Sequence, residues 1–422
     1  MTTVFAASIL RAVTVIAGLA LAVGTAGAQQ TPPVDAAAKV LRPEVANAVS
    51  AAQDAARTGQ KDVAESKLRE AAAVPNLSMF EQAVIERGRA GVSLSARDWA
   101  QGIRSLEVVV GSNQFSGADQ LQMIELLAKL TYQEKDYLRS VSWLRRYAAE
   151  GGSDPAVSDL LPQALYLANE FKATAEELET RVTADETAGR ATPEPTLRLL
   201  ASSYAQLKDD AGYLRTLERM AVVQPKPEYW SELLTRVTKQ PGFSDRLWID
   251  VYRLRLAANL MRSADEYVEL AQLALTAGYP AEALAVVDRG LSLSLLGNGK
   301  DAAAHNSLRE RASKAAEKDA ADLGRAETSA KSARDGDALV NLGYAYATSG
   351  QAAKGISLIE QGLAKGNLKR ADEARLHLGQ VLWQAGRKDD AVKAFATVQG
   401  NDGSAALARV WSAFVRSPAG KV

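Results

Sequence analysis

Residues 337–398 contain two copies of one pattern, NLGYAYATSGQAAKGISLIEQGLA at 341–364 and HLGQVLWQAGRKDDAVKAFATV at 377–398. Large apolar residues stand beside glycine or alanine at the positions that recur: Leu342, Gly343, Tyr346, Gly350, Gly355 and Ile359, then Leu378, Gly379, Leu382, Gly386, Ala391 and Phe395. Residues four apart share one helical face, and a glycine beside them lets a second helix approach closely. The pattern predicts helix hairpins in which Gly350 and Gly386 end the first helix.

This pattern resembles the tetratricopeptide repeat, a helix-turn-helix unit of 34 residues. The resemblance implies an all-α, right-handed superhelical solenoid that binds other proteins or peptide segments. The residue at which the second helix crosses the first is usually small, and it marks the position of each unit. These residues are Ala64, Gly102, Ser140, Tyr213 (an exception in size), Ala283, Gly355 and Ala391. Weaker hairpins fit the longer gaps, at 161–182, 230–254 and 308–330, so we expect about ten units.

Five segments follow from the quality of the repeats. They are a signal peptide at 1–28, a flexible lead-in at 29–42, an N-terminal array at 43–225, degenerate hairpins at 226–335, and a C-terminal pair with a capping helix at 336–422. Because each repeat contacts only its neighbours, a long chain of this kind extends its surface rather than its core.

The first 28 residues have the features of an export signal. Arg11 supplies the charge, residues 12–23 are apolar, and Ala26-Gly27-Ala28 fits the small-residue cleavage rule, which places the cut after Ala28. The alternative is an uncleaved anchor, but the run after Arg11 is short for a membrane span of about 20 residues. We therefore expect a periplasmic or secreted protein with no membrane insertion after cleavage.

Composition excludes several classes of function. The chain has no cysteine, which excludes disulfides and thiolate chemistry, and its 50 basic residues balance 50 acidic ones, which gives no reason to expect a nucleic-acid partner. His305 and His377 do not have a zinc-binding spacing and are interpreted as packing or solvated residues. Residues 297–302, GNGKDA, match a dinucleotide fingerprint but lack a preceding strand, so we interpret the glycines as a helix stop. No enzyme, cofactor or metal site is expected, the alternative being an exported enzyme whose site is built across repeats.

The resemblance also implies a binding face, because the first helix of each tetratricopeptide unit lines the concave side of the solenoid. The matching positions are Glu125, Lys129, Tyr132, Gln272, Leu275, Tyr344, Gln380 and Trp383. Exposed tyrosine and tryptophan are favoured interface anchors, although Tyr344 and Trp383 could equally pack against a neighbouring unit. Val340 and Tyr344 stand where the family's carboxylate clamp would have a lysine and an asparagine, which argues against a receptor for chaperone tails.

A second cluster combines aromatic and basic residues: Tyr229, Trp230, Phe243, Trp248 and Tyr252 with Arg246, Arg253 and Arg255. It could be a binding patch, but it lies where the repeat pattern is weakest, and packing of an irregular joint is the favoured interpretation.

From about Tyr229 onward the chain is similar to periplasmic tetratricopeptide proteins associated with TonB-type energy transduction systems. The similarity lies in LAQL at 270–273, GLAKGNLK at 362–369 and the helix expected near 405–414. It implies a non-enzymatic adaptor in the cell envelope whose partner is an inner-membrane, proton-driven complex or its periplasmic arm. A structural subunit of an envelope polysaccharide or secretion assembly would have the same kind of sequence.

Overall fold

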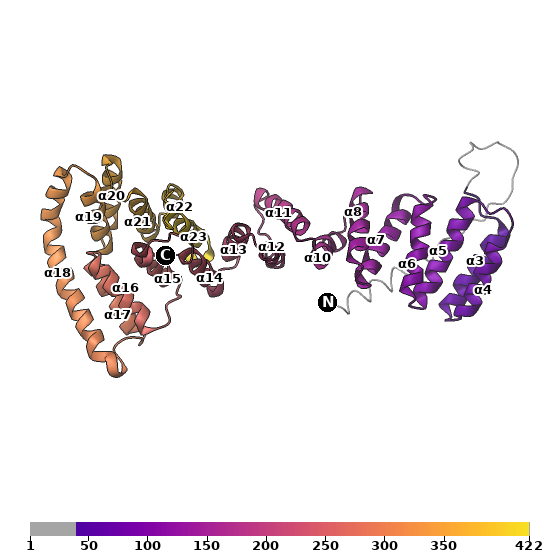
Figure 1. The fold of residues 1–422 in the computed structure, drawn as a ribbon, viewed down its shortest axis with the longest axis horizontal. Helices are drawn as coiled ribbons and strands as arrows, with labels where there is room; N and C mark the ends of the chain where they lie inside the picture. The colour runs from indigo at the N-terminus through magenta and orange to yellow at the C-terminus, as the bar shows by residue number, and fades with distance from the viewer. Residues whose placement is uncertain (1–38, 422) are drawn as a thin grey trace. The chain divides into compact units, whose positions relative to one another are not determined.

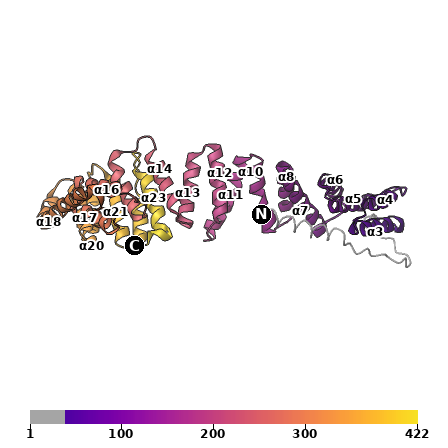
Figure 2. The same cartoon turned by 90° about the horizontal axis from the view of Figure 1, so that it is seen from below.

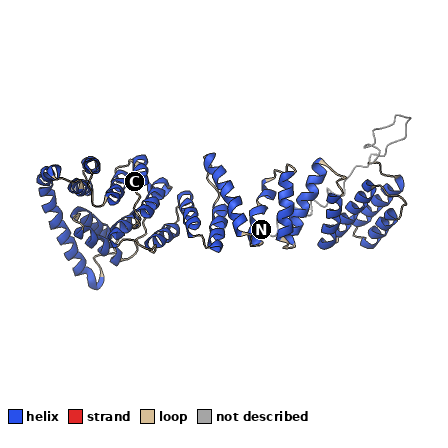
Figure 3. Ribbon diagram, turned by 45° about the horizontal axis from the view of Figure 1, so that its top comes forward, coloured by secondary structure: helices blue, strands red, loops and turns tan. Residues whose placement is uncertain are grey.

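The computed structural model describes residues 39–421, and within them every regular element is a helix (Figure 3). The expected all-α class is therefore confirmed, while the predicted signal peptide and most of the lead-in lie outside the described residues. The described residues form two compact units that meet between Leu178 and Glu179 in the sequence; we call them unit 1 and unit 2. These units do not follow the boundaries drawn at 225 and 335 from repeat quality, which stay predictions.

Unit 1 is a series of hairpins in chain order (Figure 1). They pair α3 (Pro43–Arg57) with α4 (Lys61–Ala72), α5 (Met79–Ser95) with α6 (Trp99–Gly111), and α7 (Gly117–Gln133) with α8 (Tyr137–Ala149); α9 (Pro155–Ser158), α10 (Leu160–Leu167) and the first part of α11 (Phe171–Thr187) follow. Ser78 caps α5 in a reciprocal capping box with Glu81, and Asp98 and Asp136 cap α6 and α8. Each hairpin packs on the next and buries an aliphatic core.

One ion pair joins the first hairpin to the second. Arg42 donates from Nε to Oε1 of Glu81 at 2.7 Å and from Nη2 to Oε2 at 2.9 Å. Glu81 is only 2% exposed. The side-chain hydrogen bond from Arg42 outweighs burial and lowers the pKa of Glu81 to about 2. The carboxylate form of Glu81 is therefore the form that the folded hairpins favour.

This pKa predicts how the stability of unit 1 depends on pH. Because the folded pKa lies below the unfolded one, Glu81 stabilises the fold fully above about pH 4.5, and the contribution is lost as pH falls through 4.5 toward 2. Hydrogen exchange of α3 amides measured between pH 6 and pH 3 should show faster opening at the acid end, after correction for intrinsic rates. A Glu81→Gln variant should lose most of this dependence; an equally steep dependence in the variant would contradict the assignment.

Unit 2 contains the end of α11 and the remaining helices. These are α12 (Glu194–Leu207), α13 (Asp210–Val223), α14 (Pro227–Thr238), α15 (Trp248–Ala257), α16 (Ala264–Thr276), α17 (Pro280–Ser292), α18 (Ala302–Ser332), α19 (Asp337–Thr348), α20 (Ala352–Lys365), α21 (Ala371–Gln384), α22 (Lys388–Ala396) and α23 (Ser404–Arg416). The predicted hairpin at 308–330 is wrong, since α18 is one continuous helix of 31 residues. The one glycine of this segment, Gly324, lies toward its end, and the segment has no proline. No residue therefore forces a turn between two helices.

The two copies that predicted the fold form the hairpins α19/α20 and α21/α22. A Cβ atom added to Gly343 would lie 2.6 Å from the carbonyl oxygen of Gly355, so only glycine permits this helix crossing. Gly350 and Gly386 follow the first helices with φ of +88° and +76°, the left-handed conformation expected there. Leu378, which repeats Leu342, is only half-buried, because it faces an open groove between α20 and α22, and Leu376 is the fully buried leucine of that turn.

The end of unit 2 packs back onto its beginning. The C-terminal helix α23 contacts α21 and α22, its neighbours in sequence, and also α13 and α14 (Figures 1 and 2). The backbone N–H of Ser244, before α15, donates to the carbonyl oxygen of Asp402, before α23, at 2.9 Å. Arg246 forms ion pairs with both Glu373 and Asp402. Instead of leaving an open concave side here, the hairpins of unit 2 close on themselves.

Candidate functional site

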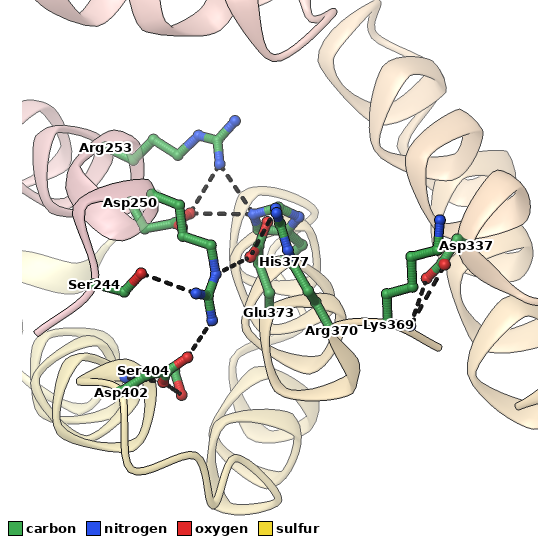
Figure 4. A network of polar contacts seen from close by, with 11 residues as sticks. Ser244, Asp250, Arg253, Asp337, Lys369, Arg370, Glu373, His377, Asp402 and Ser404 are labelled. Atoms are coloured by element: carbon green, nitrogen blue, oxygen red, sulfur yellow. Dashed lines mark hydrogen bonds and ion pairs between the residues drawn. The ribbon is translucent and has the colours of Figure 1, made fainter. Parts of the chain in front are cut away.

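The closure of unit 2 buries a cluster of charged and polar side chains. Asp250 and Arg253 come from α15, Glu282 from α17, Tyr344 from α19, and His377 and Gln380 from α21; we call these six residues the closure cluster. Figure 4 shows Arg253 and Asp250 of α15 turned toward His377 of α21. The cluster joins segments more than a hundred residues apart, so it exists only in the closed unit.

Arg253 is the centre of this cluster. Its Nη1 donates to Oδ1 of Asp250 at 2.8 Å, and its Nε and Nη2 donate to the two carboxylate oxygens of Glu282 at 2.8 and 2.7 Å. The guanidinium group lies over the ring of Tyr344, 4.4 Å from its centroid. Burial would lower the pKa of Arg253, but Glu282 and the other anionic partners hold it well above its usual value. The guanidinium is therefore held as a cation by two carboxylates and an aromatic face.

Asp250 receives most of the remaining contacts. Gln380 donates from Nε2 to Oδ1 of Asp250 at 2.9 Å, and Nε2 of His377 lies 3.3 Å from the same oxygen and 3.2 Å from Nη1 of Arg253. Although burial opposes it, the charges of His377 and Arg253 lower the pKa of Asp250 well below its usual value. Its other oxygen, Oδ2, is buried without a hydrogen-bond partner in the described structure. The polar atoms of the cluster thus face one another and give the cluster a role in holding the unit closed.

Two of the predicted binding residues belong to this buried cluster. Tyr344 and Gln380 are 0% and 1% exposed, and the Tyr344 hydroxyl donates to Oε1 of Gln380 at 3.3 Å. The expectation that they line an open concave face is wrong in this structure, because α15 and the start of α17 cover them. For Tyr344, packing against a neighbouring unit is the alternative that the structure confirms.

Trp383 is half-buried and also serves the closure. Its Nε1 donates to the carbonyl oxygen of Gly420 at 3.0 Å, and its ring lies 5.5 Å from that of Trp411 and 5.6 Å from that of Phe414 on α23. On α16, Gln272 is exposed and Leu275 is half-buried. The structure therefore does not bring the five predicted residues of unit 2 onto one surface.

The three predicted residues of unit 1 lie together on α7. Lys129 pairs with Glu125 one turn earlier, and both side chains are partly exposed. Tyr132, one turn later, is half-buried and packs edge-to-face on Tyr137, with ring centroids 5.5 Å apart. Burial raises the pKa of the Tyr132 hydroxyl. Two charged groups and one aromatic ring therefore lie on one partly exposed face of α7.

The aromatic and basic cluster around α14 and α15 divides into two parts. Tyr229, Trp230 and Arg253 are buried, and Trp230 packs edge-to-face on Phe414 of α23 at 5.6 Å, so the packing interpretation is confirmed for them. Trp248 is different, since 38% of its surface is exposed beside Phe243 and Tyr252.

Neither histidine lies in a metal site. His377 belongs to the closure cluster, and Nδ1 of His305 accepts a hydrogen bond from the backbone N–H of Gly297 at 3.1 Å. Gly297 and Gly299 have φ of +84° and +68° in the turn between α17 and α18. Their interpretation as a helix stop is wrong in detail, because α17 already ends at Ser292 and Ser294 takes the left-handed conformation there, with φ of +56°. Between residues 39 and 421, no group of three or more acidic or histidine residues is placed to hold a metal ion. None of the helices in this range combines the length and apolar character that a membrane crossing requires.

Asp250 and Glu282 were missed by sequence reasoning. A signal for Asp250 exists in the stretch LWIDVYRLRL at 247–256, where the aspartate stands among apolar residues three positions before Arg253. An acidic and a basic residue so spaced on an otherwise apolar helix indicate a buried pair. Glu282 gives no such signal, because it stands in the first turn of α17, where acidic residues are common in exposed positions.

No family model and no curated protein matches the sequence. Among solved structures, one titled as Naa15/Naa10 bound to HypK-THB matches at 14% identity with a TM-score of 0.35, over 84% of this chain and 64% of that one. The chain thus spans just under two thirds of that protein's length.

Two other structures cover more of their own chains. Yeast Tom70 matches at 12% identity with a TM-score of 0.26, over 88% of this chain and 95% of that one. The P58(IPK) TPR domain matches at 14% identity with a TM-score of 0.23, over 88% and 97%. With TM-scores below 0.5, none of the three establishes a common fold for the whole chain.

Proposed function

We propose that the protein is a non-enzymatic scaffold of the cell envelope that binds a protein partner through the face of α7 bearing Glu125, Lys129 and Tyr132. The observation that carries the proposal is the contrast between the two units. The predicted binding positions Tyr344 and Gln380 in unit 2 are covered, whereas those on α7 are partly exposed. A face that combines two charges with an amphipathic ring offers orientation and contact area together.

The closure cluster supports a non-enzymatic role. Asp250, Arg253 and His377 would be the best candidates for acid-base chemistry, but their polar atoms contact one another inside the fold. A catalytic group must reach its substrate within hydrogen-bond distance. An exported enzyme with a site built across repeats is therefore the less favoured alternative.

The proposed location in the cell envelope rests on the features of residues 1–28. The narrower proposal of an accessory to a TonB-type complex rests on the similarity of the C-terminal half. A subunit of a polysaccharide or secretion assembly remains the second candidate, because it would use the same kind of scaffold.

Site-specific crosslinking tests the proposal. A photo-crosslinking residue at position 129 should capture a defined envelope protein in intact cells, and the same residue at position 145, exposed on α8, serves as the matched control. Capture of a component of a proton-driven inner-membrane complex would support the TonB-type proposal, and capture of a cell-wall or secretion component would replace it with the second candidate. Identical products at both positions would contradict the assignment of the α7 face.

A further inference from the structure

A pocket of about 370 Å³ lies in unit 2 between α11, α12, α13 and the last turn of α23. Four aliphatic side chains form its apolar wall: Val182, Leu197, Val222 and Val223. Val182 and Leu197 are buried and belong to the packing between helices, while Val223 is exposed at the pocket's edge. The volume is within the range of about 300 to 1,000 Å³ that is usual for ligand pockets.

The charged groups around this wall are mostly basic. Four arginines and two glutamates contribute to the lining, which gives it a net charge of +2. Two of the arginines are engaged within the fold: Arg219 pairs with Glu179 at 2.8 Å, and Arg190 pairs with Asp185 at 2.8 Å. These ion pairs hold Arg219 and Arg190 in the walls of the pocket. The rest of its positive charge comes from the other two arginines.

That remaining charge is on Arg215 and Arg416. Arg215 lies on α13 and Arg416 in the last turn of α23, so the two reach the pocket from different helices. Both are exposed, and within residues 39–421 neither forms an ion pair with a carboxylate. Two guanidinium groups beside an apolar wall form a surface that a carboxylate next to an aliphatic group would complement.

Glu218 lies in the same pocket and is the group that competes for these arginines. Its side chain is 18% exposed and lies 3.6 Å from Nε of Arg409. Burial raises its pKa, against the opposing influence of Arg409, Arg416 and Arg215. An incoming carboxylate would reach Arg215 and Arg416 more readily if the charge of Glu218 were removed.

We propose that this pocket binds an acidic side chain and its aliphatic neighbour in an extended segment of a partner protein. Arg215 and Arg416, which have no carboxylate partner in the described structure, hold the carboxylate, and the valine and leucine wall takes the aliphatic side chain. The site lies on unit 2 and shares no residue with the α7 face, so it goes beyond the function proposed above and is tested without reference to it.

A defined peptide tests this proposal on the purified full-length chain. The probe is acetyl-Gly-Ser-Leu-Glu-Val-Ser-Gly-amide, in which the glutamate carries the only charge, and the same peptide with glutamine is its control. With ¹³C-methyl-labelled valine and leucine, the methyl resonances of Leu197, Val222 and Val223 should shift on titration with the glutamate peptide. The glutamine peptide should bind at least about ten-fold more weakly, since a hydrogen-bonded charge is lost.

Substitutions with opposite expected effects make the test specific. Arg215→Gln and Arg416→Gln should each weaken binding about ten-fold, whereas Glu218→Gln should strengthen it several-fold by removing the competing carboxylate. Arg334→Gln, at an exposed arginine between α18 and α19, is the matched control and should leave binding unchanged. Unchanged melting temperatures would show that the variants fold. Equal shifts with both peptides, or binding that survives both pocket arginine substitutions, would overturn the proposal.

Discussion

Replacement of Arg253 by methionine should destabilise unit 2 by about 3 to 5 kcal/mol, the cost of breaking a buried ion pair from one side. The guanidinium lies between Asp250 and Glu282, and both carboxylates are left without their cation when it is removed. Methionine keeps much of the side-chain volume, so the loss reports the charge rather than a cavity. Asp250 already has one oxygen without a partner, and it would then have to be protonated or reach water.

Arg255→Met is the control for this experiment. Arg255 lies two residues further along α15 and pairs with Glu266 at a partly exposed position, so its loss should cost no more than about 1 kcal/mol. Urea unfolding followed by tryptophan fluorescence measures both variants, because four of the six tryptophans (Trp230, Trp248, Trp383 and Trp411) are in unit 2. Equal midpoints for the two variants would show that the closure cluster does not hold the unit together.

Truncation of Trp411 to alanine should also cost about 3 to 5 kcal/mol, the usual range for a large buried aromatic residue. Trp411 is 1% exposed, stacks on Phe395 at 6.0 Å and contacts Trp383 and Phe414. It therefore anchors α23 against α21 and α22. Without it, the helix that reaches back to α13 and α14 loses its aromatic contacts with α21 and α22.

Trp411→Phe separates ring packing from the indole group. The Nε1 atom of Trp411 is buried without a hydrogen-bond partner in the described structure, so phenylalanine removes an unsatisfied donor together with part of the ring. We expect this variant to lose far less stability than the alanine variant, and thermal unfolding followed by circular dichroism compares the two. A phenylalanine variant as unstable as the alanine variant would mean that the indole nitrogen has a partner, such as water.

The hairpins could be predicted because they depend on local sequence. Gly343 and Gly355 are twelve residues apart, and their contact follows from spacing alone once both helices are assigned. The prediction failed at 308–330, where apolar residues recur at helical spacing but no turn residue separates two helices. The repeat period found elsewhere in the chain does not hold at 308–330, because this segment lacks residues that would end one helix and begin the next.

The closure of unit 2 could not be predicted in the same way. It depends on which distant segments meet, and Arg253 and His377 are 124 residues apart in the chain. The assumption that first helices face an open groove placed Tyr344 and Gln380 on a surface, whereas α15 covers them. The aromatic and basic residues near α14 and α15 did indicate an irregular joint, but the pattern did not identify α21 and α23 as the helices that fill it.

The closure also determines how each unit can fold. In unit 1 each hairpin contacts only its neighbours, so its hairpins can form and open one at a time from an end. In unit 2 the contacts of Arg246 with Asp402 and of Gln380 with Asp250 span 156 and 130 residues, and they form only after nearly the whole unit has been synthesised. Closing such long loops costs conformational entropy before the stabilising contacts form, which slows folding. During synthesis, the apolar faces of α14 and α15 therefore stay uncovered until α21 and α23 have been made, and in this interval the chain is most exposed to aggregation.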